Sequence, residues 1–401
     1  MKQINEEFES WTLLHISSRF GKVEATRMLL DRGAVIDARE YNGKTPLHWA
    51  SQNGHVEVVR MLLARGAAID ACANDRMTPL HWASLNGYVE VVRILLDRGA
   101  SIDARDNEEN TPLHFASLLD HVEVVRMHLD CGAAIDAREN NGWTLLHLAS
   151  WRGNVEVVRM LLGRGATIDA RDNDGSTPLR CASHDGHIEV VRMLLDRGAA
   201  VAARQNDGST PLHWASLCGH IEAVRMLLGR GAFNDARDND GRTPLHLASQ
   251  NGHVEVVRML LDRGAAIDAR SNYGWSPLHW ASKYGHVKVV RVLLDCGAPL
   301  MAADKAGADA FYLCIGESSF AEIATILRER GADVACRLNG SAIPPQRKGF
   351  SAMHRACQKG LVESVRHLLK WVPDLNTVDM DGNTCLQICV MRDAIKVRVS
   401  Y

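Results

Sequence analysis

Histidine is the residue type best suited to do chemistry in this sequence, because 18 of the 401 residues are histidine. His48 and His55 stand seven residues apart, and the same pair returns along the chain. A metal site needs three or four ligands gathered around one ion. These histidines recur as single rows along the chain, so we expect them to serve structure. The sequence predicts no metal ion and no cofactor.

Cysteine is the second candidate, with ten residues spread over the chain. Cys357, Cys385 and Cys389 come closest to forming a group, yet none has a histidine or cysteine partner at zinc-like spacing. The sequence has neither a C-x-x-C motif nor a regular pairing pattern, which is typical of free thiols in a reducing compartment. We therefore predict a cytoplasmic protein, with the nucleus as a further compartment.

Motifs for other chemistry are absent from the sequence. It contains no G-x-x-x-x-G-K-[ST], G-x-G-x-x-G, G-x-S-x-G or H-E-x-x-H. The 46 basic and 48 acidic residues give a formal net charge of -2, with no long run of one sign that would favour nucleic acid or an anionic membrane. No apolar run approaches the roughly 18 residues of a spanning helix. We predict that the chain is not an enzyme and binds neither nucleic acid nor membrane.

A repeated stretch must position all these residues. Residues 45–63, which read TPLHWASQNGHVEVVRMLL, return in close copies every 33 residues. With the threonine position as the marker, the copies begin at Thr12, Thr45, Thr78, Thr111, Thr144, Thr177, Thr210, Thr243, Ser276, Asp309, Ser351 and Thr384. The chain is therefore an array of twelve repeats.

Each repeat carries the signals of two short helices. Thr45 is a favourable N-cap and Pro46 suits the first helical position. Gly54 supplies the left-handed residue that closes this first helix. A second helix is predicted over 56–65, and the turn-forming residues 67–77 that follow predict an extended β-hairpin finger.

The period of 33 residues, with T-P-L-H-x-A, then G-H, a Val-rich segment, L-L and G-A, resembles the ankyrin repeat over nearly the whole chain. The resemblance implies an all-α repeat solenoid of stacked helix-turn-helix units with β-hairpin fingers. In that family the first histidine bonds the capping threonine and the backbone of a neighbouring finger. A helix pair of this size cannot bury its apolar face alone, so neighbouring repeats must stack.

The predicted organisation is one continuous superhelical domain. Residues 1–11 form a polar leader, 12–337 hold repeats one to ten, 338–349 form an extended finger loop with two prolines, and 350–401 hold repeats eleven and twelve, the last one truncated. Repeat one has no finger before it, which suits an N-terminal cap with a polar outer face.

Four positions depart from the repeated pattern. Arg76 and Glu109 replace the finger glycine, Asp120 replaces the glycine that closes the first helix, and Arg180 replaces the histidine of T-P-L-H. Because glycine is favoured where the backbone is left-handed, we expect the finger tips of repeats three and four to differ in shape.

Charged residues form columns through the repeats. Pairs at i, i+3 on the second helix are expected to bond along a solvated face; they are Glu57/Arg60, Glu90/Arg93, Glu123/Arg126, Glu156/Arg159, Glu189/Arg192, Glu222/Arg225 and Glu255/Arg258. A finger column of arginines, beginning at Arg39, alternates with a column of aspartates, beginning at Asp37. We expect the two finger columns to stabilise the fingers; the alternative is a phosphate-binding stripe.

The resemblance implies that function lies in the finger tips and first-helix ends, which line a concave groove. Most of these positions are small and polar. Two groups break that rule: Met77, Leu85, Leu118, Leu119, Trp143, Trp151 and Arg152 in repeats three to five, and Tyr273, Trp275, Lys283 and Tyr284 in repeat nine. Exposed clusters of this composition are typical of interface hot spots. The alternative is that some of these side chains fold back onto neighbouring helices.

The resulting prediction is a non-catalytic protein-protein interaction scaffold or adaptor, monomeric, that binds one or more partner proteins through the groove. One alternative is a substrate-recruiting subunit of a larger enzyme complex such as a ubiquitin ligase. Another is a host-directed effector of a host-associated microbe.

Overall fold

The computed structural model describes residues 11–316, 319–332, 351–371, 376, 378–379 and 381–391. Most of the predicted leader, the whole of the predicted loop at 338–349 and the end of repeat twelve lie outside these described residues.

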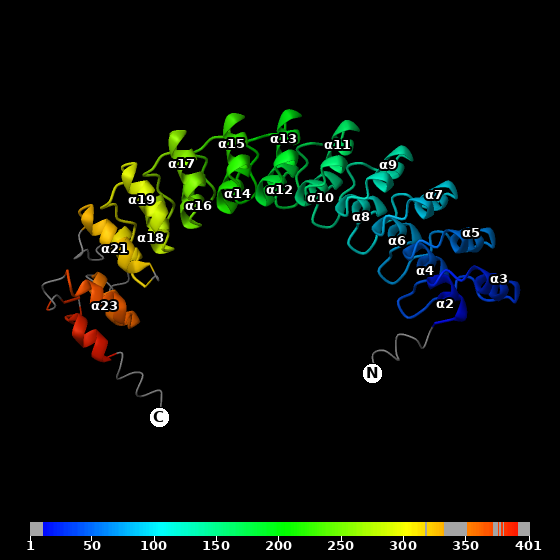
Figure 1. The fold of residues 1–401 in the computed structure, drawn as a ribbon, viewed down its shortest axis with the longest axis horizontal. Coiled ribbons are helices and arrows are strands. Elements are labelled where there is room, and N and C mark those ends of the chain that lie inside the picture. The colour runs from blue at the N-terminus through cyan, green and yellow to red at the C-terminus, as the bar shows by residue number, and fades with distance from the viewer. Residues whose placement is uncertain are drawn as a thin grey trace, which may run out of the picture. The chain divides into compact units, whose positions relative to one another are not determined.

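Repeats one to eleven each contain the predicted pair of helices (Figure 1). The first helices are α2 (Leu13–Arg19), α4 (Pro46–Gln52), α6 (Pro79–Leu85), α8 (Pro112–Leu118), α10 (Leu145–Arg152), α12 (Pro178–Asp185), α14 (Pro211–Cys218), α16 (Pro244–Gln250), α18 (Pro277–Lys283), α20 (Ala310–Leu313) and α22 (Ala352–Lys359). The second helices are α3 (Val23–Asp31), α5 (Val56–Ala64), α7 (Val89–Asp97), α9 (Val122–Asp130), α11 (Val155–Gly163), α13 (Ile188–Asp196), α15 (Ile221–Gly229), α17 (Val254–Asp262), α19 (Val287–Asp295), α21 (Phe320–Glu329) and α23 (Val362–Leu368). A further helical segment spans 385–391 in repeat twelve.

A threonine and a histidine start the first helix. The backbone N–H of Thr45 donates to Nδ1 of His48 at 3.0 Å, and the Thr45 hydroxyl lies 2.9 Å from the same nitrogen. Because Nδ1 accepts from the backbone, the proton of the neutral ring lies on Nε2, which donates to the carbonyl of Met77 at 3.1 Å. The first histidine of the motif therefore caps its own helix and bonds the next finger, as the resemblance implies.

The chain divides into two compact units. The N-terminal unit comprises residues 1–182 and 187–200, and the C-terminal unit comprises 183–186 and 201–401. The sequence predicted one continuous domain, whereas this boundary falls inside α12. In a solenoid each repeat contacts only its neighbours, so long-range contacts are few and the chain can divide without a break in the repeat pattern.

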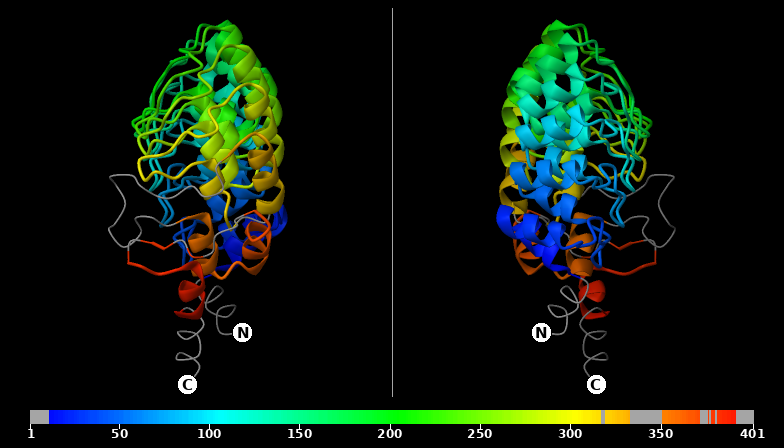
Figure 2. Two further views of the ribbon diagram at one scale, coloured as in Figure 1. Left: turned by 90° about the vertical axis from the view of Figure 1, so that its left-hand side faces the viewer. Right: turned by 90° about the vertical axis from the view of Figure 1, so that its right-hand side faces the viewer.

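Both units are built in the same way. In the N-terminal unit the first helices α2, α4, α6, α8 and α10 pack side by side, and the second helices α3 to α13 form a parallel row behind them. In the C-terminal unit α14, α16, α18 and α20 form the row of first helices, and α15, α17, α19, α21 and α23 form the second row. Within each unit the fingers project to one side of the helices (Figure 2).

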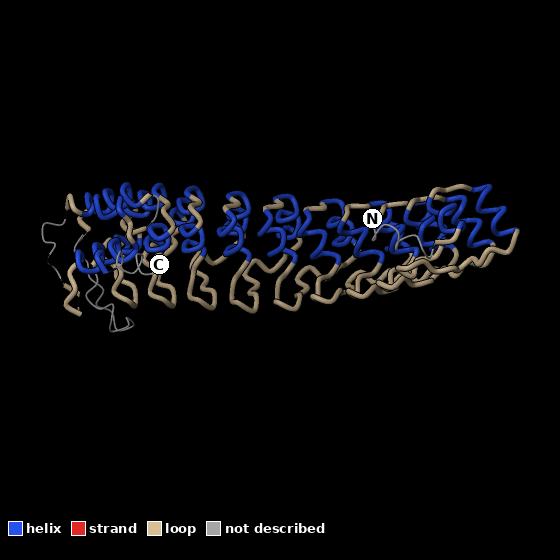
Figure 3. The backbone as a smooth tube through the Cα atoms, turned by 90° about the horizontal axis from the view of Figure 1, so that it is seen from below, coloured by secondary structure: helices blue, strands red, loops and turns tan. Residues whose placement is uncertain are grey.

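The fingers are turns closed by a few hydrogen bonds. Glu40 N–H donates to Lys44 O at 3.1 Å, and Gly43 N–H donates to Glu40 O at 2.8 Å. The fingers also bond sideways, since Asn74 N–H donates to Asn42 O of the preceding finger at 2.9 Å. In the described residues the predicted β-hairpins thus reduce to tight turns with isolated bridges, and the fingers appear as loops in Figure 3.

The two charged finger columns bond the backbone of the next finger. Asp37 accepts from Ala68 N–H at 3.0 Å, and Arg39 donates to Cys72 O at 2.7 Å. The same bonds recur in later repeats; for example, Asp103 accepts from Ala134 N–H, and Arg270 donates to Ala303 O. These bonds favour the finger-stabilising interpretation over a phosphate-binding stripe.

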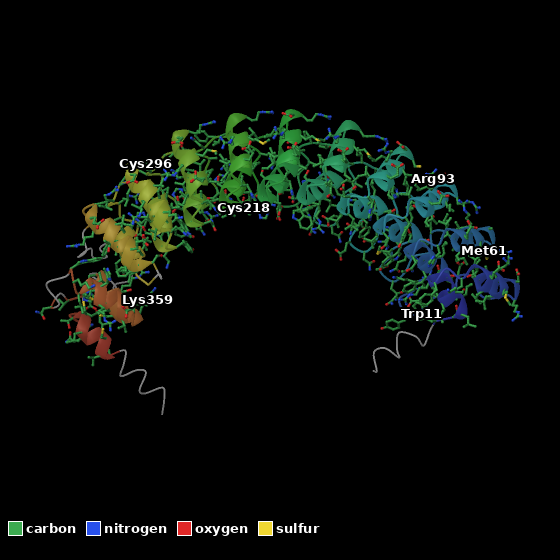
Figure 4. All side chains as sticks on the ribbon, in the orientation of Figure 1. Trp11, Met61, Arg93, Cys218, Cys296 and Lys359 are labelled. Atoms are coloured by element: carbon green, nitrogen blue, oxygen red, sulfur yellow. The ribbon has the colours of Figure 1, made fainter. Side chains whose placement is uncertain are left out.

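The charge column on the second helices forms ion pairs at six of the seven expected places, those from Glu57/Arg60 to Glu222/Arg225. Glu90 and Arg93 approach to 3.5 Å, and Glu222 and Arg225 approach to 3.0 Å. Both partners are largely exposed in each pair, so each pair adds little to stability. Figure 4 shows Arg93 on the side of the second helices, away from Trp11 on the side of the first helices.

Three residues without glycine's freedom adopt left-handed backbone angles. Arg76, Glu109 and Asp120 have φ values of 64°, 62° and 59°. Arg76 N–H still donates to Ala73 O at 2.9 Å, matching the bond of Gly43 in the finger before it. The fingers that contain Arg76 and Glu109 therefore have the same backbone turn as the other fingers, and the prediction that their tips differ in shape is wrong for the backbone. The non-glycine residues adopt this turn at the cost of local strain.

The strain at these fingers reaches the neighbouring asparagines. A Cβ on Gly43 would lie 2.5 Å from Oδ1 of Asn74. Beside that glycine, Asn74 donates to Tyr41 O at 3.0 Å, and beside Arg76 the corresponding Asn107 bond lengthens to 3.4 Å. The extra side chain thus displaces the asparagine that joins two fingers.

The Arg76→Gly variant should therefore be more stable than the wild type by roughly 0.5 to 1 kcal/mol. Relief of left-handed strain, about 1 to 2 kcal/mol, exceeds the extra entropy that glycine gives the unfolded chain, about 0.5 to 1 kcal/mol. Urea unfolding measures the change. The matched control is Gly142→Arg, at the same place in repeat five, which should be destabilising. An Arg76→Gly variant less stable than the wild type, or a Gly142→Arg variant as stable as the wild type, would contradict the strain argument.

One histidine lies in the core and outside the repeated columns. His128 occupies the place that Leu95 and Leu161 hold in neighbouring repeats, and it is fully buried. Its Nε2 lies 2.8 Å from the Ser84 hydroxyl, while its Nδ1 has no hydrogen-bond partner among the described residues. Burial lowers the pKa of His128 to about 4, so the ring is neutral near pH 7.

The outer face of repeat one is apolar. Leu13 is 67% exposed and Met28 is 54% exposed, and both line one recess together with Ile16, Ala25 and Leu29. The prediction of an N-terminal cap with a polar outer face is therefore wrong for the described part of repeat one. Leu13 and Met28 occupy positions that in later repeats face the preceding repeat.

Candidate partner-binding surfaces

The ends of the first helices are held in place by the following repeat. His55 Nε2 donates to the Arg19 carbonyl at 2.8 Å, His121 donates to Leu85 O at 3.0 Å, and His187 donates to Trp151 O at 2.8 Å. These carbonyls lie at helix C-termini, where the helix itself offers no donor. The side chains at the helix ends are therefore presented from a fixed backbone.

Trp143 and Trp151 lie together in the N-terminal unit. Trp143 is the last residue of the finger of repeat five. Its backbone N–H donates to the Glu139 carboxylate at 2.9 Å. Trp151 lies near the end of α10, and the two rings meet edge to face with centroids 5.7 Å apart. The Arg152 guanidinium lies 4.8 Å from the centre of the Trp151 ring. We call Leu85, Leu118, Leu119, Trp143, Trp151 and Arg152 the Trp151 surface.

The leucines of the Trp151 surface come from the ends of α6 and α8. Leu119 is exposed, and Leu85 and Leu118 are half-buried. Met77 differs from the prediction, because it is only 8% exposed. Its carbonyl bonds His48 of the preceding repeat, which holds this part of the finger against the helices, so Met77 offers almost no contact area.

The second surface lies on repeat nine in the C-terminal unit. Tyr273 at the finger tip is 61% exposed, and Tyr284 at the end of α18 is 47% exposed. Trp275 is half-buried, and its Nε1 donates to Asp304 at 2.8 Å. Lys283 is half-buried on α18. We call Tyr273, Trp275, Trp280, Lys283 and Tyr284 the Tyr284 surface.

Trp280 links the members of the Tyr284 surface. Its ring meets Trp275 at 4.7 Å and stacks on Tyr284 at 5.9 Å, with only 6° between the two planes. Trp280 is absent from the predicted site residues, because Trp49, Trp82 and Trp214 occupy the same place in other repeats and suggest a common structural role. Its neighbours at 275 and 284, four or five residues away, carry the signal that could have identified it.

A third group, missed in the sequence, lies at the start of the N-terminal unit. Arg19 lies about 5 Å from the rings of Trp11 and Trp49, and Lys44 Nζ lies 4.6 Å and 3.5 Å from the rings of Trp49 and Trp82. Burial lowers the pKa of Lys44, with Asp75 and Glu40 opposing the shift. Each of the two cations therefore lies within cation–π distance of two tryptophan rings.

The described residues contain no group of three or more histidine, cysteine, aspartate or glutamate side chains able to hold a metal ion. Burial raises the pKa of the Cys181 thiol to about 11, which keeps it protonated. No helix in the described part of the chain is long and apolar enough to cross a membrane. The features that stand out are thus the two aromatic surfaces.

Comparison with known proteins agrees with the repeat pattern. A family model described as ankyrin repeats (three copies) matches residues 1–75, 42–106, 66–139, 103–172, 165–238, 231–304 and 267–338. A search of curated proteins found no match. Repeats of this type are generally modules for protein-protein interaction. The chain belongs to the ankyrin-repeat family.

Proposed function

We propose that this protein is a non-catalytic scaffold or adaptor that binds one or more partner proteins through the Trp151 and Tyr284 surfaces. The observation that carries the proposal is the gathering of exposed aromatic rings at the ends of first helices, among them Trp151, whose carbonyl is bonded by His187 of the next repeat. Trp, Tyr and Arg are the residue types that dominate the energy of protein interfaces.

Rigidity is the physical basis of binding in this proposal. The Trp151 carbonyl is bonded by His187, and the Trp151 ring packs against Trp143 and Arg152. Tyr284 is held by its stack on Trp280. A surface whose side chains are already ordered loses less conformational entropy when a partner binds, so affinity comes from shape and apolar contact.

The cysteines support a reducing compartment for this function. All nine cysteines in the described residues are free, and Cys72, Cys131 and Cys296 are exposed. Exposed free thiols persist where glutathione keeps proteins reduced. We therefore place the scaffold in the cytoplasm or nucleus.

The test begins with affinity capture by the intact chain and identification of the bound proteins by mass spectrometry. Binding of the captured partner is then measured with Trp151→Ala and with Tyr284→Ala. Loss of an aromatic hot spot costs about 2 kcal/mol or more of binding free energy. We therefore expect the dissociation constant of at least one variant to be roughly 30-fold larger than that of the wild type. Circular dichroism should show unchanged helical content, because both side chains are exposed.

Phe233→Ala is the matched control. Phe233 is 65% exposed but lies in the loop after α15, outside both surfaces, so its removal should leave affinity unchanged. If neither surface variant weakens binding, the two surfaces are not the binding site. A captured ubiquitin-ligase core would instead make the protein a substrate-recruiting subunit.

A further inference from the structure

Arg19 and Lys44, at the start of the N-terminal unit, are cations without a carboxylate partner. Lys44 is only 8% exposed, and its ammonium donates to Gln52 at 3.0 Å. Neither cation forms an ion pair with a carboxylate of the described residues. Both lie against tryptophan rings, which attract a cation but carry no net charge to neutralise it.

Repeat eight shows how a cation at the place of Lys44 can be paired. Arg242 stands at that place, and it bonds the carboxylates of Asp238 and Asp240 at 2.8 Å and 3.3 Å. Glu40 occupies the place of Asp238 in repeat two. Its carboxylate accepts from the backbone N–H of Lys44 at 3.1 Å, while the ammonium lies over tryptophan rings instead.

The tryptophans of this group add further donors without acceptors. The Nε1 atoms of Trp49 and Trp82 are buried and have no hydrogen-bond partner among the described residues. Trp214, at the same place in repeat seven, donates to Gln205 at 2.6 Å and to Ser209 at 2.9 Å. Buried donors are normally bonded, so this end of the N-terminal unit is short of acceptors.

We propose that the surface around Arg19 and Lys44 binds an acidic, extended segment of a partner protein, with carboxylates at alternate positions. We call it the Arg19 surface; it comprises Trp11, Arg19, Phe20, Lys44 and Trp49. The Arg19 guanidinium and the Lys44 ammonium lie 5.0 Å and 4.6 Å from the centre of the same Trp49 ring. Alternate residues of an extended chain point the same way and are about 7 Å apart, so each cation meets one carboxylate.

The charges around Lys44 favour an acidic partner. Burial and, to a smaller extent, the like charge of Arg19 lower the pKa of Lys44, while Asp75 and Glu40 oppose this shift. Asp75 accepts from the backbone of its own finger at 2.9 Å. A carboxylate placed between Arg19 and Lys44 stabilises both charged forms.

The rings around the cations favour a peptide over a nucleic acid. Phe20 is 59% exposed, and the Arg19 guanidinium lies 5.7 Å from its ring. An apolar side chain two residues before the first acid therefore finds an apolar contact. Bases of a single-stranded nucleic acid need free ring faces, whereas Arg19 and Lys44 already lie over the rings of Trp11 and Trp49. Figure 4 shows Trp11 on the side of the first helices.

A synthetic peptide tests the Arg19 surface on the full chain. The probe is fluorescein-labelled GSLSDSDSG, in which the leucine and both aspartates occupy alternate positions, and binding is followed by fluorescence anisotropy. We expect saturable binding to the wild type. The control peptide GSLSNSNSG, which lacks both charges, should bind at least about tenfold more weakly.

Two variants remove the cations singly. Arg19→Gln and Lys44→Met introduce the residues that the next repeat carries at these places, so circular dichroism should show unchanged helical content. Each should weaken binding of GSLSDSDSG at least about tenfold. The matched control is Arg242→Met, which removes a cation that is already paired and should leave binding unchanged. Trp151→Ala should also leave it unchanged, so this test is independent of the proposed function.

Four results would overturn the proposal. The first is the absence of saturable binding of GSLSDSDSG, and the second is equal binding of GSLSNSNSG. The third is unchanged affinity in both Arg19→Gln and Lys44→Met, or an equal loss in Arg242→Met. The fourth is tighter binding of labelled oligothymidylate than of GSLSDSDSG, with loss of that binding in Arg19→Gln, because the surface would then serve a nucleic acid.

Discussion

Lowering the pH from 7 to 5 is expected to unfold the protein cooperatively, through histidines that the fold keeps neutral. Burial lowers the pKa of His48, His114, His128, His246 and His279 to about 4. It also lowers the pKa of His15, His81, His147 and His213. Each ring is buried in its place in the repeat and is released to water on unfolding.

The sign of the effect follows from proton uptake. In the unfolded chain a histidine binds a proton near its ordinary pKa of 6.5, whereas these buried rings stay neutral until about pH 4. The unfolded state therefore binds more protons between these values, and stability falls with pH. The contribution is fully present above pH 6.5 and is lost progressively down to about pH 4.

The expected size is large for one type of side chain. Each pH unit inside the window is worth about 1.4 kcal/mol per histidine. His48, His114 and His128 lie in the N-terminal unit. Because the unfolded histidines are only half protonated at pH 6.5, this unit alone should lose roughly 3 kcal/mol between pH 6.5 and 5.5. Whole domains are stable by about 5 to 15 kcal/mol. Urea unfolding at pH 7, 6 and 5, followed by circular dichroism, measures the loss.

His128→Leu is the matched variant for the acid effect. The His128 imidazole does not cap a helix. Replacing it with leucine, the residue at this place in the neighbouring repeats, should therefore keep the helices intact. The variant should take up about one proton fewer on unfolding, and it should be more stable than the wild type at pH 7 because the unpartnered Nδ1 is removed. A pH slope identical to that of the wild type would show that His128 does not titrate as its burial requires.

The second large effect is expected at Asp120 and Asn154, where a larger side chain in one repeat is matched by a smaller one in the next. In other repeats a ring of the next repeat packs on the glycine that closes the first helix; a Cβ on Gly87 would lie 2.7 Å from Nδ1 of His121. Asp120 stands at such a glycine position, and there the next repeat carries Asn154 in place of histidine. The shorter amide still donates to Ser117 O at 2.8 Å and to Leu118 O at 3.2 Å.

Asn154→His should therefore destabilise the protein by roughly 2 kcal/mol, because its ring would overlap the Asp120 side chain and force the helix ends apart. Adding Asp120→Gly should recover most of this loss, since the double variant has the pair found in neighbouring repeats. A double-mutant cycle by urea unfolding should give a coupling energy of about 2 kcal/mol. Strictly additive single effects would show that the two side chains do not compete for space.

The local structure of the repeats could be predicted from the sequence because each signal is short-range. Thr45, Pro46 and Gly54 fix the limits of the first helix through caps and backbone angles that involve only nearby residues. Leu119, Trp151, Tyr273 and Tyr284 could be predicted as exposed because they interrupt a polar pattern, and the structure leaves these four side chains exposed.

Other features depended on contacts between repeats, which the sequence does not display directly. Met77 is buried because its finger is held by His48 of the preceding repeat. Lys44 lies between tryptophans that are five residues and 38 residues further along the chain. The match between Asp120 and Asn154 becomes visible only when successive repeats are superposed.

The histidine bonds also determine how the array can change in length. His48 bonds a carbonyl 29 residues ahead, and His55 bonds a carbonyl 36 residues behind. Both separations refer to positions within the 33-residue period, so insertion or deletion of one complete period restores every such bond with the new neighbour. Loss of part of a period leaves donors and acceptors facing the wrong residues. Recombination between these near-identical segments can therefore lengthen or shorten the protein in whole periods while keeping each junction hydrogen-bonded.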